Sequence, residues 1–321
     1  MMPADVLRKA IRAIKEQTTH PFAVNLFARS SGSPVSLQDL QQAYASDPML
    51  QAIRRDLGLT TPTTYSLRSP PLKDQIEVIL QEQVRVVSFT FGLLPPDVMS
   101  QLKKAGIYLI GTATSVDEAR ILKQNQIDAM VAQGAEAGGH RGTFENPDGG
   151  LDLSTKDLVK AIKGVVKDVP VLAAGGISSG PLAAEALTHW HADGVVLGTL
   201  FMLSKESATP PAHRYVLLHS EQEKPTRITR GLTGRRARGF PNAFMDRMDS
   251  LDTKTIPEYD IHSSKTKDIV AHATKNGITD YMLLLAGANA SDAAQYSNQG
   301  TLSAAEIMRK LMIDIKDCFV V

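Results

Sequence analysis

The sequence predicts an α/β fold with a parallel sheet and a smaller, mostly helical domain. Short apolar runs alternate with helical patterns, which is typical of repeated βα units. The chain has 321 residues, a length that fits two domains, or one α/β barrel of roughly 250 residues with a smaller addition. Because 43% of the residues are hydrophobic and 21% are charged, the chain can bury a substantial core.

Six short apolar runs that contain β-branched residues are candidate strands. They span 21–28, 84–91, 107–112, 129–133, 169–174 and 194–198. Continuous apolar runs of this length are typical of parallel strands that are buried on both faces. The repeated order of strand and helix predicts right-handed crossovers between neighbouring strands.

Helices are expected between these runs, and several have recognisable first turns. The expected ranges are 96–105, 115–125 and 153–166, with an amphipathic helix before the first run and another after residue 303. Capping boxes are indicated where a serine precedes a glutamate by three residues: Ser115 with Glu118, and Ser303 with Glu306. Pro181 stands at a favoured first helical position.

Two segments interrupt this alternation. Residues 29–69 form a polar insertion with weak helical patterns, and residues 205–281 contain no strand pattern. We therefore expect a barrel-like domain from residues 1–204 and 282–321, and a small helical, substrate-binding domain from residues 205–281. Two methionines of the helical domain are expected in its core rather than at a cofactor: Met245 and Met248.

Charge and cysteine content argue against several classes of protein. Lys and Arg total 35 and Asp and Glu total 34, so the net charge of +1 gives no general attraction to nucleic acid or to a membrane surface. The single cysteine, Cys318, permits no intrachain disulfide. No apolar run approaches the ~20 residues that span a bilayer, and the N-terminus lacks a signal peptide's apolar region. A cytoplasmic location is expected.

Clustered arginines and scattered histidines are expected to be structural. The arginines are Arg227, Arg230, Arg235, Arg236 and Arg238. Few aromatic residues lie among them, so a loop of the substrate-binding domain is preferred over a nucleic-acid interface. No metal is expected, because these histidines match no metal-binding spacing: His213, His219, His262 and His272.

The most informative motif is the loop QGAEAGGHRG at residues 133–142. It follows a predicted strand, at the end where α/β barrels place their active sites. Its four glycines let the backbone approach a ligand closely and offer N–H groups to it. His140 lies in this loop, where an imidazole that titrates near neutral pH can act as a base or contact a ligand.

Two further glycine loops follow the next two predicted strands. They are AAGGISSG at residues 173–180 and VLGTLF at residues 196–201. Adjacent loops of this kind, with a helix N-terminus, form the phosphate site of many barrels. Neither matches the dinucleotide motif or the nucleotide-binding P-loop, so we expect the phosphate of flavin mononucleotide (FMN).

In this order, the loops resemble the nitronate monooxygenase family, formerly called 2-nitropropane dioxygenases. The resemblance extends to PFAVNLFA at residues 21–28, GVVLGTLFMLSKES at residues 194–207 and TRGLTGRRARGF at residues 229–240. It implies a (β/α)8 TIM barrel that binds FMN, with a helical domain inserted after the last strand. It also implies oxidation of alkyl nitronates or nitroalkanes by O2 to a carbonyl compound and nitrite.

The resemblance also implies roles for individual residues. His140 matches the family's active-site histidine, which would take the α-proton of a nitroalkane or hold the nitronate beside the flavin. Flavin contacts are implied for Asn25, Gln133 and Gly138, and phosphate contacts for Gly175, Gly176, Gly198 and Thr199. Three neighbouring residues are also expected to bind the cofactor: Gly139, Val196 and Leu197. The expected partners are a small-molecule nitronate and O2, with a homodimer allowed.

The sequence departs from the family pattern at three places. The family begins with two strands, the first carrying Gln-Ala-Pro-Met, whereas this sequence begins in what resembles a later helix. The barrel is therefore expected to be incomplete at its N-terminal side, with unpaired strand edges. Leu200 stands in place of the family's arginine, and residues 284–289 lack its Trp and Gln.

Two other interpretations stay open. FMN-dependent enoyl-carrier-protein reductases, which use NAD(P)H, share a Gly-Gly-His-x-Gly loop. Glu136 and Ala137 before this loop favour the nitronate enzymes over the reductases. Alternatively, a chain without the first two strands would be a truncated, non-catalytic relative that binds no flavin.

Overall fold

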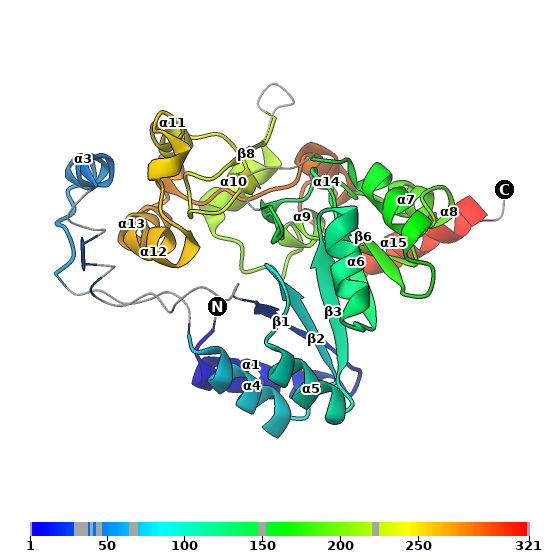
Figure 1. Cartoon of the computed structure of the whole chain (residues 1–321). Coiled ribbons are helices and arrows are strands. Elements are labelled where there is room, and N and C mark those ends of the chain that lie inside the picture. Colours follow the sequence, from blue (N-terminus) through cyan, green and yellow to red (C-terminus); the bar gives the residue numbers. More distant parts are fainter. Residues whose placement is uncertain are drawn as a thin grey trace.

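The computed structural model describes residues 2–28, 38, 41–42, 47–63, 70–146, 152–219 and 225–319, and a parallel sheet lies at its centre (Figure 1). The strands are β1 (Ala23–Phe27), β2 (Val86–Thr90), β3 (Tyr108–Ala113), β4 (Ala129–Gln133), β6 (Val171–Ala174) and β7 (Gly194–Val196). They lie in chain order, and every neighbouring pair is parallel. Each strand coincides with a predicted run, to within one residue at β3, so the six strand predictions are confirmed.

The two faces of the sheet differ in burial. One face is fully buried, at Leu26, Val87, Phe89, Leu109 and Met130. On the other face Ala23 and Asn25 are exposed, and Tyr108 is 41% exposed. The prediction of burial on both faces is therefore wrong for these strands. Within the described ranges, β1 and β7 end the sheet without pairing to each other, so these strands do not close into a barrel.

Helices cover the buried face and follow the strands as predicted. They are α5 (Pro96–Lys104), α6 (Val116–Gln124), α7 (Thr155–Val165) and α8 (Gly180–Thr188), and α15 (Ala304–Phe319) packs on α8. Serine side chains accept a backbone N–H in the first turns of α6, α7 and α8, which satisfies donors that a helix leaves unpaired. Ser303 and Glu306 form the complete capping box predicted for α15. A further pair, α1 (Ala4–Gln17) and α4 (Leu72–Gln81), packs together beside β1 and β2 (Figure 1).

A second hydrophobic cluster forms in the other half of the molecule. Its side chains come from α10 (Pro211–Leu218), α11 (Ala243–Asp249) and α13 (Lys267–Asn276), and short 3-10 helices lie at Thr253–Thr255 and Thr279–Tyr281. The helix α12 (Tyr259–Lys265) contacts α13. Met245 and Met248 are buried in it, which confirms that they are core residues. The cluster also includes side chains of α3 (Pro48–Asp56), α9 (Thr199–Met202) and α14 (Ala290–Tyr296). The domain division at residues 205 and 281 therefore stays a prediction.

A small antiparallel sheet joins this half of the molecule to the histidine loop. Its strands are β5 (Gly139–His140), β9 (Ala237–Gly239) and β8 (Arg227–Thr229), in that spatial order. The expectation that residues 205–281 contain no strand is wrong. Each of these strands has two or three residues, which is too short to show the alternating pattern of a strand in the sequence.

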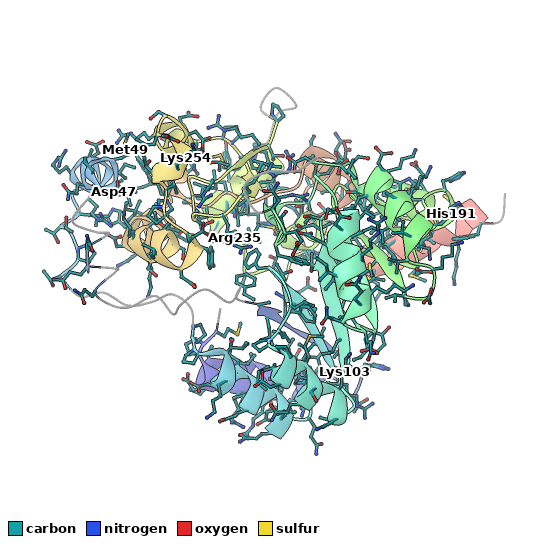
Figure 2. All side chains as sticks on the ribbon, viewed as in Figure 1. Asp47, Met49, Lys103, His191, Arg235 and Lys254 are labelled. Atoms are coloured by element: carbon teal, nitrogen blue, oxygen red, sulfur yellow. The ribbon has the colours of Figure 1, made fainter. Side chains whose placement is uncertain are left out.

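Buried ion pairs attach α3 to helices that lie far from it in the sequence (Figure 1). Arg54 Nε lies 2.7 Å from Asp268 Oδ2, and Lys265 Nζ lies 2.6 Å from Asp47 Oδ2. Asp47, labelled in Figure 2, caps the first turn of α3 through the N–H of Leu50. Since both cations are almost fully buried, removing one partner would leave an uncompensated charge.

The clustered arginines contact other parts of the chain. Three form ion pairs: Arg227 with Asp246 and Asp249, Arg230 with Glu258, and Arg236 with Asp152. Two donate to backbone carbonyls: Arg235 to Thr143 and Arg238 to Ala135.

In the part of the chain that the structure describes, no helix has both the length and the apolar character needed to cross a bilayer.

Candidate active site

A cavity of about 660 Å³ lies at the carboxyl ends of the parallel strands. Its lining comes from the strands of the parallel sheet, from the three glycine loops, from α9 and α10, and from the segment before and within α14. Ligand sites of α/β barrels lie at this end of the strands, and small-molecule pockets commonly measure roughly 300–1,000 Å³.

Polar side chains line the cavity at the ends of β1, β2 and β3. Ser88 Oγ donates to Asn25 Oδ1 at 2.9 Å, between residues that are paired in the register of β1 and β2. The hydroxyls of Thr90 and Thr112 lie 2.9 Å apart. Our sequence analysis named only Asn25 among these residues. The alternation of side chains along VVSFT in β2 could have indicated Ser88 and Thr90, because it places both on the same face of the sheet as Asn25.

Gln133 holds the histidine loop through both ends of its side-chain amide. Its Nε2 donates to the carbonyl of His140 at 2.9 Å, and its Oε1 accepts the N–H of Gly142 at 2.7 Å. Gln133 also lines the cavity. Its clearest function in this structure is thus to shape the loop that would contact a ligand.

Gly138 and Gly139 are required by the loop for different reasons. A Cβ on Gly138 would lie 2.4 Å from the backbone nitrogen of Gly287, so no larger residue fits there. Gly139 has a φ of 77°, in the left-handed region that favours glycine. Both residues line the cavity.

The ring of His140 lies beside the cavity, against a cluster of aromatic side chains. Its Nε2 lies 2.9 Å from Thr233 Oγ1. The rings of Phe91 and Tyr259 meet it edge-on, with centroids at 5.8 and 5.3 Å, and Phe27 lies at 6.3 Å. Figure 2 shows Arg235 between the helices of the second cluster and the sheet, and its guanidinium lies 4.1 Å from the centre of the Phe91 ring.

Arg141 anchors the other side of the loop. It is 3% exposed, and its guanidinium donates to the carbonyls of Gln133 and Gly134 at the end of β4. Asp152 lies 3.7 Å away and also pairs with Arg236. Burial lowers the pKa of Arg141, and the Asp152 carboxylate opposes that shift.

The second and third glycine loops meet the segment before α14. Gly175 and Gly176 have φ angles of 121° and 69°, which explains why both are glycine. Asn289 Nδ2 donates to the carbonyl of Gly176 at 2.6 Å. Thr199 Oγ1 accepts the N–H of Gly287 at 3.0 Å. The segment that contains Gly287 and Asn289 therefore contacts both loops predicted to hold a phosphate. No contact to these loops was predicted for it from the sequence.

Most of the predicted site residues come together. The cavity is lined by Asn25, Gln133, Gly138, Gly139, Gly175, Gly176, Val196, Gly198 and Thr199. His140 and Leu197 do not line it; Leu197 packs against both hydrophobic clusters. The sequence analysis missed the segment from Leu283 to Asn289 and His213 on α10, which also line the cavity. The segment could have been recognised from the sequence, because residues 284–289 resemble a segment of the family.

The cavity has features that fit a flavin. A Cβ on Gly198 would have no heavy atom within 4 Å, so the glycine leaves open space at the cavity wall. Backbone N–H groups of glycine loops suit a phosphate. In addition, His213 Nε2 is buried at the wall and has no hydrogen-bond partner among the described residues, as expected where a ligand completes the site.

Comparisons with known proteins show the family and the fold of this chain. A family model described as nitronate monooxygenase matches residues 1–314. A probable nitronate monooxygenase of Staphylococcus aureus (strain Newman) is 37% identical over 282 residues, covering 88% of this chain and 77% of the relative. Nitroalkane oxidase from Streptomyces ansochromogenes has a TM-score of 0.83 at 28% identity, over 99% of this chain and 87% of that one. FabK from Thermotoga maritima shares the fold, with a TM-score of 0.69 at 24% identity, over 99% and 83%. The predicted α/β fold of the TIM-barrel type is confirmed.

Proposed function

The chain belongs to the nitronate monooxygenase family of flavin-dependent oxidoreductases, and from this premise we propose that it uses FMN and O2 to oxidise alkyl nitronates to a carbonyl compound and nitrite. The observation that carries the proposal is the cavity at the strand ends, which three glycine loops enclose next to His140. The loops at Gly175–Gly176 and at residues 196–199 would hold the phosphate. Asn25 and the loop from Gln133 to Gly139 would face the flavin ring.

His140 is the proposed catalytic base. When bound, the flavin supplies the electron and oxygen chemistry, and the chain supplies the proton transfer. The imidazole would take the α-proton of a nitroalkane, leaving the nitronate anion, and the resulting imidazolium would hold that anion. The rings of Phe27, Phe91 and Tyr259 around His140 suit the alkyl part of such a substrate.

The test starts with reconstitution and anaerobic reduction. The purified protein is loaded with FMN, and its absorbance is followed after rapid mixing with a nitronate such as propyl-2-nitronate, or with NADPH, without oxygen. Reduction of the flavin by the nitronate, followed by nitrite release once O2 is admitted, is the expected result. Rapid reduction by NADPH but not by the nitronate would favour an enoyl-carrier-protein reductase. A protein that takes up no FMN would be a non-catalytic relative.

A further inference from the structure

His213 is a polar residue of the cavity wall that lies outside the three glycine loops and outside the sheet. His213 lies on α10 and is 5% exposed. The lining of the cavity also includes the apolar side chains of Leu200, Met202, Leu283 and Leu285. His213 is therefore a hydrogen-bonding group on a wall that includes many apolar side chains.

The ring of His213 is satisfied on one side only. Its hydrogen bond to the backbone of Leu285 raises its pKa, so the group contacted is the carbonyl, which can only accept. Nε2 is the buried atom without a partner among the described residues, which leaves Nδ1 as the ring nitrogen toward the Leu285 carbonyl. Because buried polar atoms are rarely left unpaired, this nitrogen is suited to a ligand in the cavity.

The tautomer decides which ligand group suits Nε2. Burial lowers the pKa of His213 more than the Leu285 carbonyl raises it, which favours the neutral ring. With its proton on Nδ1, a neutral imidazole presents a lone pair at Nε2. That lone pair accepts from an O–H or N–H group, whereas an ionised phosphate offers acceptors only.

The segment before α14 runs from the contact with His213 to the glycine loop at Gly175 and Gly176. Along this segment Leu285, Gly287 and Asn289 all line the cavity. Leu285 contacts His213 at one end, and Asn289 binds Gly176 at the other. Because Gly287 of this segment also contacts Thr199, the lone pair at Nε2 and not the position of His213 favours a contact to a part of the ligand other than its phosphate.

We propose that His213 is a cofactor-binding residue whose Nε2 accepts a hydrogen bond from an O–H or N–H group of the flavin rather than contacting its phosphate. This assignment rests on the proposed binding of FMN. His213 would then add to the cavity a side-chain hydrogen-bond acceptor for the flavin from outside the three glycine motifs.

The test measures the affinity of the apoprotein for FMN and for riboflavin, which lacks the phosphate, by quenching of flavin fluorescence. We expect His213→Phe to bind both flavins roughly 10-fold more weakly than the wild type, because one hydrogen bond is lost. His213→Gln, which keeps an acceptor, should recover part of the loss. His219→Phe, an exposed position at the end of the same helix, is the matched control and should bind like the wild type.

Four results would refute either the assignment of His213 or the proposed function. Unchanged affinity in His213→Phe, or a loss for FMN without a loss for riboflavin, would refute the assignment. A wild type that binds neither flavin would instead refute the proposed function. In the folded wild type, the ¹⁵N chemical shift of His213 Nε2 should move when riboflavin is added, and an unmoved shift would refute the assignment even if the Phe variant fails to fold. Lumiflavin, which lacks the ribityl chain, identifies the donor. If His213→Phe also binds lumiflavin more weakly than the wild type does, the donor is the N–H of the flavin ring. If both bind lumiflavin equally, the donor is a ribityl hydroxyl.

Discussion

His140 Nε2 and Thr233 Oγ1 lie 2.9 Å apart, and the same hydroxyl lies 3.3 Å from the carbonyl oxygen of Arg235. A threonine hydroxyl has one proton, and a carbonyl can only accept. Both contacts are satisfied together only when Thr233 donates to Arg235 and accepts from Nε2 of His140. The neutral form of His140 then carries its lone pair on Nδ1, which makes Nδ1 the nitrogen that can take a proton.

Replacing His140 by alanine should separate proton transfer from flavin binding. We expect His140→Ala to keep its flavin, because the ring does not line the cavity. Turnover of a neutral nitroalkane should fall about 10²- to 10⁴-fold, the usual contribution of a general base. Turnover of a preformed nitronate should fall much less, since its proton is already removed. Nitrite release measures both, with His219→Ala as control. Unchanged turnover of the nitroalkane would remove His140 from the mechanism.

Thr233 is expected to act through His140. In Thr233→Val the Nε2–H of His140 loses its acceptor, so kcat/KM for a neutral nitroalkane should fall by about 10-fold, with flavin affinity unchanged. Thr233→Ser keeps the hydroxyl and should retain most of the activity. Equal losses in the Val and Ser variants would indicate that packing, rather than the hydrogen bond, explains the effect.

Gly198 should tolerate a side chain in the protein but not with a bound flavin. A Cβ at this position meets no heavy atom within 4 Å, and φ is −105°, which any residue adopts. We therefore expect Gly198→Ala to fold normally and to bind FMN roughly 10-fold more weakly, because the methyl group occupies ligand space. Gly164→Ala, also in open space but on α7, is the matched control. Equal FMN affinity in both variants would place the flavin elsewhere.

His262 should make the second cluster sensitive to acid. Burial lowers its pKa to about 4, although its hydrogen bond to the Gly231 carbonyl opposes the shift. Unfolded His titrates near 6.5, so between pH 6.5 and 4 the unfolded state binds a proton that the folded state does not, and stability falls as the pH falls. The titration of His262 should therefore make the free energy of unfolding about 2 kcal/mol lower at pH 5 than at pH 7.

Urea unfolding at the two pH values measures this loss. His262→Gln, which cannot titrate, is the comparison and should lose correspondingly less stability between pH 7 and pH 5. The same pH dependence in the variant and the wild type would show that other groups are responsible.

Local sequence was sufficient for the strands and for the loops that enclose the cavity. A buried strand of a parallel sheet needs only a few consecutive apolar residues, so the six runs could be recognised without knowing their neighbours. The glycine loops were recognisable for a similar reason: Gly139, Gly175 and Gly176 have positive φ angles that the local backbone requires. Capping by Ser115 and by Ser303 is likewise a relationship within four residues.

Contacts over long sequence separations were decided only by the tertiary structure. Thr233 lies 93 residues from His140, yet it reaches the ring because β9 pairs with the two-residue strand β5. His213 likewise belongs to a helix, α10, whose apolar side chains pack in the second cluster. No local pattern encodes these approaches, since the packing of that cluster selects which residues face the cavity. The sequence by itself thus determined the sheet, the glycine loops and the histidine within them. The tertiary structure decided that Thr233 contacts Nε2 of that histidine and which further residues complete the cavity.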